Sequence, residues 1–257
     1  MVQTDVLKNG YKILQDTERF QFGIDAVLLA DFTTRSGNKS NKSVNNLVKA
    51  GEKVIDLGTG TGIIPLLMAG KLTGVSFTGL EVQKESADMA AKSVALNGLE
   101  GTINIRHGDL REVAGLFDRH SFDVVTCNPP YMIDVHGKCN ELDAKSIARH
   151  EVLCTLEDVV AAADYLLAPH GRFFMIHRPF RLPEIFESLA AHKLEAKRMR
   201  LIQPFANKEP NMVMIEARKN AKRRLTIEPP LIVRYDDGEY TAEIQKIYNG
   251  LPDQAGQ

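Results

Sequence analysis

The strongest constraint on the fold is a regular alternation between short apolar runs and stretches with helical periodicity. The alternation begins with an apolar run at 53–57, continues with a helical pattern at 61–69, and is repeated along the chain. Such alternation predicts an α/β fold, with a mainly parallel sheet covered by helices on both faces. The predicted strands cover 53–57, 75–82, 102–107, 122–127, 171–176, 197–203 and 212–217, and the predicted helices cover 61–69, 84–97, 110–117, 156–167 and 183–192.

The end of the pattern differs from its beginning. No helical stretch separates the last two strands, so we expect them to form an antiparallel pair at the edge of the sheet. Beyond them, Asp237-Gly238 indicates a hairpin turn, followed by a short helix. We therefore expect an N-terminal segment with a Ser/Asn/Lys-rich loop (1–50), a core domain (51–220) and a hairpin and helix extension (221–257).

Composition excludes several classes of protein. Hydrophobic residues make up 44% of the 257 residues and charged residues 25%, which is the balance of a globular chain with a sizeable core. The first residues lack the apolar core of a signal peptide, and no uncharged stretch is long enough to span a membrane. The cysteines Cys127, Cys139 and Cys154 have neither disulfide-framework nor zinc-site spacing. We therefore expect a cytoplasmic protein without a metal or a membrane anchor; the sequence does not indicate its oligomeric state.

A glycine-rich segment follows the first of these strands. It reads Asp56-Leu-Gly58-Thr-Gly60-Thr-Gly62, and glycines between a strand and a helix let a ligand approach the backbone closely. A dinucleotide site would require a third glycine where Ile63 stands. Asp56 would also repel a pyrophosphate. The segment instead suits a ligand that carries an ammonium group and a sulfonium but no phosphate, which describes S-adenosylmethionine.

Two further acidic residues follow the next two strands. Glu81 ends the strand at 75–82, where its carboxylate can accept both hydroxyls of a ribose. Asp109 follows the strand at 102–107, where it can accept from the amino group of an adenine or cap the helix at 110–117. With their neighbours Val82 and Leu110, these acids complete the predicted cofactor site.

The apolar strand at 122–127 ends in Asn128-Pro129-Pro130-Tyr131, named the proline motif below. An exocyclic amino group on an sp² carbon is a poor nucleophile, because its lone pair is delocalised. The Asn128 side-chain oxygen and the Pro129 carbonyl can accept its two hydrogens and favour the form that attacks a methyl group, while the prolines hold both acceptors in place. Tyr131 can stack on the planar substrate group. We therefore expect these four residues to carry catalysis, with Asn128 also beside the cofactor.

These motifs together resemble the amino-group methyltransferases that depend on S-adenosylmethionine. Residues 20–30 (FQFGIDAVLLA) and 148–151 (ARHE) further resemble the small-domain methyltransferases that modify the adenine beside the anticodon of a valine tRNA. The resemblance implies a Rossmann-like class I methyltransferase fold, with a seven-stranded sheet whose last strand is antiparallel. It also implies an adenine turned out of its stack into the site. On this resemblance Phe22, Arg149 and His150 are expected to contact the RNA.

The distribution of charge also bears on the substrate. Between residues 172 and 224 there are 13 Lys and Arg against 5 Glu and no Asp, a net charge of +8. Such a segment indicates either a polyanion partner or a set of solvated basic faces. On the first interpretation Lys197, Arg198 and Arg200 contact RNA.

Other functions remain open on sequence alone. A protein methyltransferase acting on a glutamine amide uses the same proline motif but carries a helical substrate domain, for which 1–55 leaves little room. A DNA adenine methyltransferase would need a separate target-recognition region. A nicotinamide dehydrogenase is disfavoured by Asp56 and Ile63, and an inactive RNA-binding protein by the intact proline motif.

Overall fold

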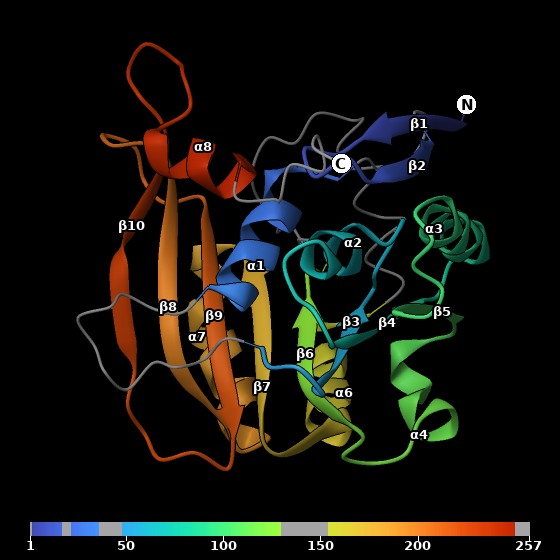
Figure 1. The fold of residues 1–257 in the computed structure, drawn as a ribbon. Coiled ribbons are helices and arrows are strands. Elements are labelled where there is room, and N and C mark those ends of the chain that lie inside the picture. Colours follow the sequence, from blue (N-terminus) through green and yellow to red (C-terminus); the bar gives the residue numbers. More distant parts are fainter. Residues whose placement is uncertain (1, 17–21, 36–47, 130–153, 250–257) are drawn as a thin grey trace, which may run out of the picture.

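The computed structural model describes residues 2–16, 22–35, 48–129 and 154–249. Within these ranges a central twisted sheet contains eight strands (Figure 1). Strand β9 is antiparallel to both of its neighbours, and the other neighbouring pairs are parallel. The order across the sheet is β10 (Thr226–Arg234), β8 (Leu194–Phe205), β9 (Met212–Lys219), β7 (Leu167–His177), β6 (Phe122–Cys127), β3 (Lys53–Leu57), β4 (Ser76–Glu81) and β5 (Ile103–His107).

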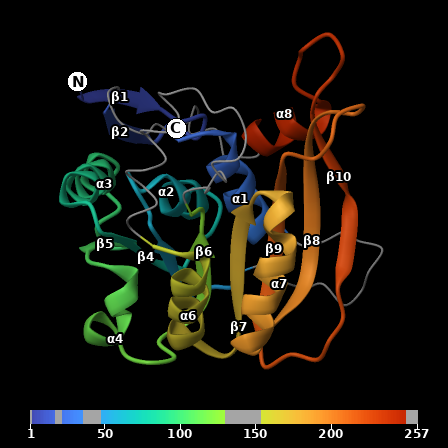
Figure 2. The ribbon, with the colours of Figure 1, turned by 180° about the vertical axis from the view of Figure 1, so that it is seen from behind.

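Helices cover both faces of this sheet. Helices α1 (Ile24–Thr34) and α2 (Ile63–Ala69) lie on the face seen in Figure 1, and α6 (Leu156–Leu166) and α7 (Leu182–Ala191) lie on the face seen in Figure 2. Each face has its own cluster of buried apolar side chains. Shorter or peripheral elements are α3 (Lys84–Leu96), η1 (Leu110–Glu112), α4 (Val113–Leu116) and η2 (Pro179–Arg181).

The predicted strand and helix pattern from residue 53 to residue 219 is confirmed. Strands β3 and β6 have the expected bounds, and helix α6 begins with the expected cap. The Thr155 hydroxyl accepts from the backbone N–H of Asp158, whose carboxylate accepts from the backbone N–H of Thr155. The antiparallel pairing of the last two predicted strands, β8 and β9, is also present.

In the C-terminal extension the expected turn at Asp237-Gly238 and the short helix are confirmed, but the strand before the turn does not pair within a local hairpin. Residues Thr226–Arg234 form β10, which pairs in parallel with β8 and becomes an eighth strand at the sheet edge. The turn at Asp237-Gly238 returns only as far as an isolated bridge between Arg234 and Tyr240 before helix α8 (Ala242–Asn249). Pro229 and Pro230 interrupt the register, which an edge strand tolerates because it need not donate on its outer side.

The first 35 residues contain structure that the sequence patterns did not predict. Strands β1 (Val2–Val6) and β2 (Lys12–Asp16) form an antiparallel hairpin beside α3. The Ser93 hydroxyl of α3 accepts from the backbone N–H of Leu14 at 2.9 Å. Helix α1 is buried on nearly all sides and packs against α2, β7, β9 and α8. A helix buried all round has no polar stripe, so the usual amphipathic signal is missing.

Arg198 and Arg200 are buried structural residues, which corrects their assignment to an RNA surface. Arg198 is 2% exposed; its Nε donates to Glu216 at 2.8 Å and its Nη1 to Glu228 at 3.2 Å. Its guanidinium also lies over the ring of Phe32, 3.8 Å from the centroid. Arg200 is 5% exposed and makes a bidentate pair with Glu243 in α8. These pairs join β8 to β9, β10 and α8 and are not presented to a phosphate.

The cations of the basic segment, residues 172–224, are partly buried in ion pairs and partly exposed at different places. Four of its cations are buried, and each forms an ion pair with a carboxylate: Arg172, Arg198, Arg200 and Lys219. The exposed remainder is split between the two ends of the sheet, because Lys208 follows β8 while Lys222, Arg223 and Arg224 precede β10. The net charge of +8 therefore does not form one patch.

No helix in the described ranges is long and apolar enough to cross a membrane. Among the same residues, no group of three or more His, Cys, Asp or Glu side chains could hold a metal ion.

Candidate active site

The glycine-rich segment leaves β3 as a tight loop that leads into α2. Gly58, Gly60 and Gly62 all have positive φ, at 68°, 57° and 85°, a region that side chains with a Cβ rarely adopt. The loop is fixed from β4, because the Leu80 carbonyl accepts from the N–H groups of Gly58 and Thr59. A Cβ at Gly58 or Gly60 would meet no described protein atom within 4 Å, so this part of the backbone can be approached closely by a ligand.

Asp56 lies beneath this loop and is 1% exposed. Its Oδ1 accepts from the Thr126 hydroxyl of β6 at 2.6 Å, whereas its Oδ2 has no hydrogen-bond partner among the described residues. Burial raises the pKa of Asp56 from 3.8 to about 7, with Thr126 and Thr59 opposing the rise and Glu81 adding to it. A buried carboxylate with an unpartnered oxygen is a site for a cationic group, which agrees with the predicted role toward an ammonium group.

Glu81 lies at the end of β4 and is 5% exposed. Its Oε2 accepts from the N–H of Gly60 and its Oε1 from the N–H of Gln83, both at 2.9 Å. These bonds fix the carboxylate against the glycine loop. Each carboxylate oxygen can accept a second hydrogen bond, so both ribose hydroxyls can still be accommodated. The half-buried Val82 follows, and its carbonyl oxygen lies 3.0 Å from His107 Nε2 at the end of β5.

Asp109 caps the short helix η1, as the alternative interpretation of the sequence anticipated. Its Oδ1 accepts from the backbone N–H of Arg111, and both of its oxygens accept from the Arg111 guanidinium. The hydrogen bonds from Arg111 lower the pKa of Asp109. Asp109 would have to release part of this ion pair to accept from an adenine amino group. The neighbouring Leu110 is buried in the core under α6 and α7.

Asn128 follows β6 directly and is half-buried, while Pro129 is buried. Cys127, the last residue of β6, is paired with Leu57 of β3 on one side and with Met175 of β7 on the other. Asn128 is therefore placed between the start of the glycine loop and the end of β7. The glycine loop and the Asn128 amide therefore lie on neighbouring strands at the carboxyl edge of the sheet, where α/β folds bind their ligands.

Of the other residues predicted to contact RNA, the two that the structure describes do not lie together. Phe22 is half-buried and packs against the core on the α1 face, and its backbone N–H donates to Gln15 Oε1. Lys197 is half-buried and its Nζ donates to the carbonyl of Lys222 at the opposite edge of the sheet. Pro130, Tyr131, Arg149 and His150 lie outside the described residues.

Sequence patterns missed three side chains that shape the site: Thr126, Thr59 and Arg111. Thr126 could have been found, because a hydroxyl in the apolar run of β6 needs a partner and parallel pairing sets it beside Asp56. Arg111 follows Asp109 by two residues, a common spacing for a cap and its ion pair, but nothing in the sequence singled it out.

Fold and site together define a Rossmann-like class I methyltransferase. The chain belongs to the methyltransferase small domain family, whose model matches residues 39–192, more than half of the chain. The fold is similar to the crystal structure of a predicted O-methyltransferase from Agrobacterium tumefaciens, with a TM-score of 0.65 and 24% identity. That similarity covers 91% of this chain and 99% of the other.

Curated relatives carry one recurring name, tRNA1(Val) (adenine(37)-N6)-methyltransferase. The protein of that name from Porphyromonas gingivalis is 28% identical over 198 residues, covering 75% of this chain and 76% of its own length. The one from Flavobacterium psychrophilum is 23% identical over 245 residues, covering 94% of this chain and 96% of its own length. The donor set at the end of β3 and β4 fits S-adenosylmethionine, the cofactor of this enzyme class.

Proposed function

We propose that the chain transfers a methyl group from S-adenosylmethionine to N6 of an adenine in a tRNA anticodon loop. The observation that carries this proposal is the position of Asn128 and Pro129 at the carboxyl edge, one strand away from the glycine loop and Asp56. The curated relatives named for methylation of tRNA adenine support the same substrate. Since the substrate is tRNA, the cytoplasm is the proposed compartment.

Bound S-adenosylmethionine supplies an electrophilic methyl group on a positively charged sulfur. The chain's own residues hold the two reactants. Asp56 would hold the ammonium group through Oδ2, and Glu81 would hold the ribose hydroxyls through the lone pairs that Gly60 and Gln83 leave available. The Asn128 Oδ1 and the Pro129 carbonyl accept the two N6 hydrogens, which localises the nitrogen lone pair toward the methyl carbon.

The methyl transfer needs no side chain to act as a base, because the proton can leave the nitrogen after the new bond has formed. The N6 lone pair would form the new N–C bond while the S–C bond breaks, and the electron pair of the S–C bond would pass to the sulfur and remove its positive charge. The nitrogen then carries a positive charge and loses one proton to water. Burial lowers the pKa of His177, which is 3% exposed at the end of β7, to about 4, so this imidazole is neutral at pH 7.

The direct test is incubation of the purified protein with labelled S-adenosylmethionine and three acceptors. These are unmodified valine tRNA, the same tRNA with guanine in place of the target adenine, and a glutamine-containing protein. We expect label in the first RNA alone, recovered as N6-methyladenine in its digest. Label in the protein acceptor but in neither RNA would instead assign the chain to glutamine methylation.

A further inference from the structure

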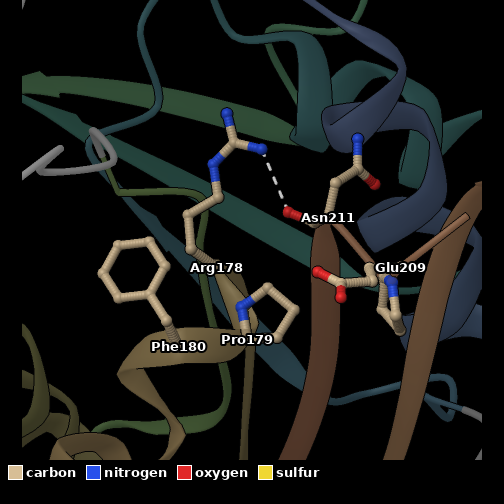
Figure 3. Close-up of a pocket in the computed structure, with 6 residues that line it drawn as sticks. Arg178, Pro179, Phe180, Glu209 and Asn211 are labelled. Atoms are coloured by element: carbon tan, nitrogen blue, oxygen red, sulfur yellow. Dashed lines mark hydrogen bonds between the residues drawn. The ribbon is translucent and has the colours of Figure 1, made fainter. Parts of the chain in front are cut away.

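A pocket of about 640 Å³ opens at the carboxyl edge of the sheet, beside the proposed target site. Its walls come from the turn after β7 and from the loop between β8 and β9 (Figure 3). Residues Arg178, Pro179 and Phe180 form the first wall, and Glu209, Pro210 and Asn211 form the second. No residue of the proposed cofactor site lines this pocket.

The pocket lies next to Asn128 because β7 is the sheet neighbour of β6. The parallel register pairs Cys127 with Met175, so Asn128 and Pro129 leave β6 at the level of Ile176 and His177, the two residues that precede the first pocket wall. Neighbouring strands lie about 4.8 Å apart. An adenine held at Asn128 therefore leaves the next nucleotide of its strand within reach of this pocket.

Phe180 gives the pocket its chemical character. It lies in η2 and is 57% exposed, which is unusual for a phenylalanine, and Figure 3 shows its ring extending outward from η2. An exposed aromatic ring beside a nucleic-acid site is a stacking surface, because every base has a π face.

The first wall is held rigidly. The backbone N–H of Arg178 donates to His177 Nδ1 at 2.8 Å, and Arg178 Nη1 donates to the Asn211 carbonyl at 3.0 Å (Figure 3). The second bond joins the two walls and fixes the Arg178 guanidinium beside Asn211. A guanidinium has five N–H groups, so it can also contact a phosphate or the sugar edge of a nucleotide.

Glu209 determines which part of a nucleotide the pocket can take. Its carboxylate is exposed on the second wall and would repel a phosphate, but it accepts well from N–H groups of a base. The combination of ring, guanidinium and carboxylate therefore matches an unpaired base better than a backbone phosphate.

We propose that this pocket holds an unpaired nucleotide adjacent to the target adenine, with its base stacked on Phe180 and its N–H groups directed at Glu209. This inference rests on the proposed RNA substrate. It assigns Phe180, Arg178 and Glu209 a positioning role, since they hold the RNA beside the reacting adenine and do not touch N6.

The test combines protein variants with anticodon stem-loops that lack one base. Three RNAs are compared: the intact stem-loop, and two in which the base before or after the target adenine is abasic. Phe180→Ala should weaken binding of the intact RNA by roughly 5- to 150-fold, the range for loss of one base–aromatic stack. The same substitution should have almost no further effect on one of the two abasic RNAs, because the stacking partner is already missing.

Controls separate stacking from folding. Phe180→Tyr keeps a stacking ring and should restore the affinity. Leu96→Ala removes a comparable exposed side chain, 51% exposed on α3, and should leave RNA affinity unchanged. Calorimetry with S-adenosylmethionine should give wild-type cofactor affinity for all three variants.

The outcomes are distinguishable from those of the proposed function. If wild type methylates the intact stem-loop but Phe180→Ala weakens all three RNAs equally, or none, the pocket does not hold a flanking base while the RNA substrate stands. If wild type neither binds nor methylates any stem-loop, the RNA substrate and this inference fail together. The abasic RNA whose binding Phe180→Ala does not weaken further is the one that lacks the base held in the pocket, so it identifies which neighbour of the target adenine the pocket binds.

Discussion

The Thr126 hydroxyl donates to Asp56 Oδ1 across 2.6 Å, connecting the strand that leads into the cofactor loop with the strand that ends in Asn128. The bond is completely buried and leaves Asp56 Oδ2 without a partner in the described part of the chain. One carboxylate thus links the cofactor side of the site to the catalytic side.

Cofactor affinity should depend on pH through Asp56. Its pKa is raised to about 7, so below that pH the free protein holds a proton that the ammonium group of the cofactor must displace. We expect affinity for S-adenosylmethionine to be highest between about pH 7 and 8, to fall by up to about tenfold for each pH unit below 7 as Asp56 takes up a proton, and to fall again at higher pH as the ammonium group of the cofactor loses its proton. Calorimetry in buffers of different ionisation enthalpy would also detect the released proton. Constant affinity and no proton release down to pH 5.5 would contradict this role for Asp56.

Asp56 should also make the free protein less stable at high pH. A carboxylate whose folded pKa exceeds its unfolded pKa gives stability that is complete below pH 4 and lost as pH rises to 7. At pH 8 we expect Asp56→Asn to increase the free energy of unfolding by on the order of 2–4 kcal/mol. The gain should shrink toward pH 4 in urea titrations. Asp118→Asn, at an exposed carboxylate, is the control and should change stability by less than about 0.5 kcal/mol.

Asn128 should act on the rate of methyl transfer. Asn128→Ala removes one acceptor for the target amino group, and we expect the single-turnover rate to fall by roughly 10²–10³-fold. At saturating cofactor the wild-type rate should be nearly flat from about pH 6.5 to 9, since no side-chain base takes part. Asn128→Asp keeps an oxygen acceptor and should retain more activity than Asn128→Ala. A bell-shaped profile at saturating cofactor would show that a titrating group has been missed.

The buried pair between Arg198 and Glu216 should be required for stability and not for RNA binding. Arg198→Met removes the ion pair that Arg198 makes with Glu216, which is 0% exposed, and we expect a loss of about 3–5 kcal/mol in the free energy of unfolding. Replacing both residues, as in Arg198→Met with Glu216→Leu, should recover part of that loss. Lys197→Met changes the next residue along β8 and should cost less than 1 kcal/mol. Unchanged urea midpoints for Arg198→Met would refute the structural assignment.

The salt dependence of RNA binding should distinguish the two ends of the sheet. Lys208 is exposed in the loop that follows β8, at the same edge as Asn128, so Lys208→Gln should reduce the log–log salt slope by about 0.7. Lys222→Gln, at the opposite edge, is the matched control and should leave the slope unchanged. Equal effects from both would mean that the RNA also reaches the amino edge of the sheet.

The central fold could be predicted from the sequence, because strands and helices alternate regularly from residue 53 to residue 219. The structure places the glycine loop, Asp56, Glu81 and Asn128 at one edge of the sheet, as expected for residues at strand ends, and their roles toward cofactor and substrate stay predictions. The roles of Arg198 and Arg200 could not be predicted, because a charged residue inside a strand gives no sign of whether a partner from a distant element covers it. Their partners Glu216, Glu228 and Glu243 lie 18, 30 and 43 residues away in the sequence.

The N-terminal and C-terminal elements were harder for different reasons. Helix α1 is buried on nearly all sides and lacks a separate polar face, so periodicity could not distinguish it from a buried strand. For β10, the following Asp237-Gly238 turn suggested a local hairpin. Strand β10 instead pairs with β8, which lies far from it in the sequence. The pairing runs from Thr226 opposite Arg198 to Arg234 opposite Phe205.

The place of β10 has a consequence for the order of assembly during synthesis. Strand β8 precedes β10 in the chain, so its outer edge stays unpaired until Thr226–Arg234 has emerged from the ribosome. During that interval Arg198 lacks Glu228 and Arg200 lacks Glu243, whereas every described residue of the glycine loop, β4 and β6 has already been made. The nascent protein therefore contains the proposed cofactor-binding strands and loop before β10 pairs with the outer edge of β8. Until then, that unpaired edge is the place where a chaperone or a second nascent chain would bind.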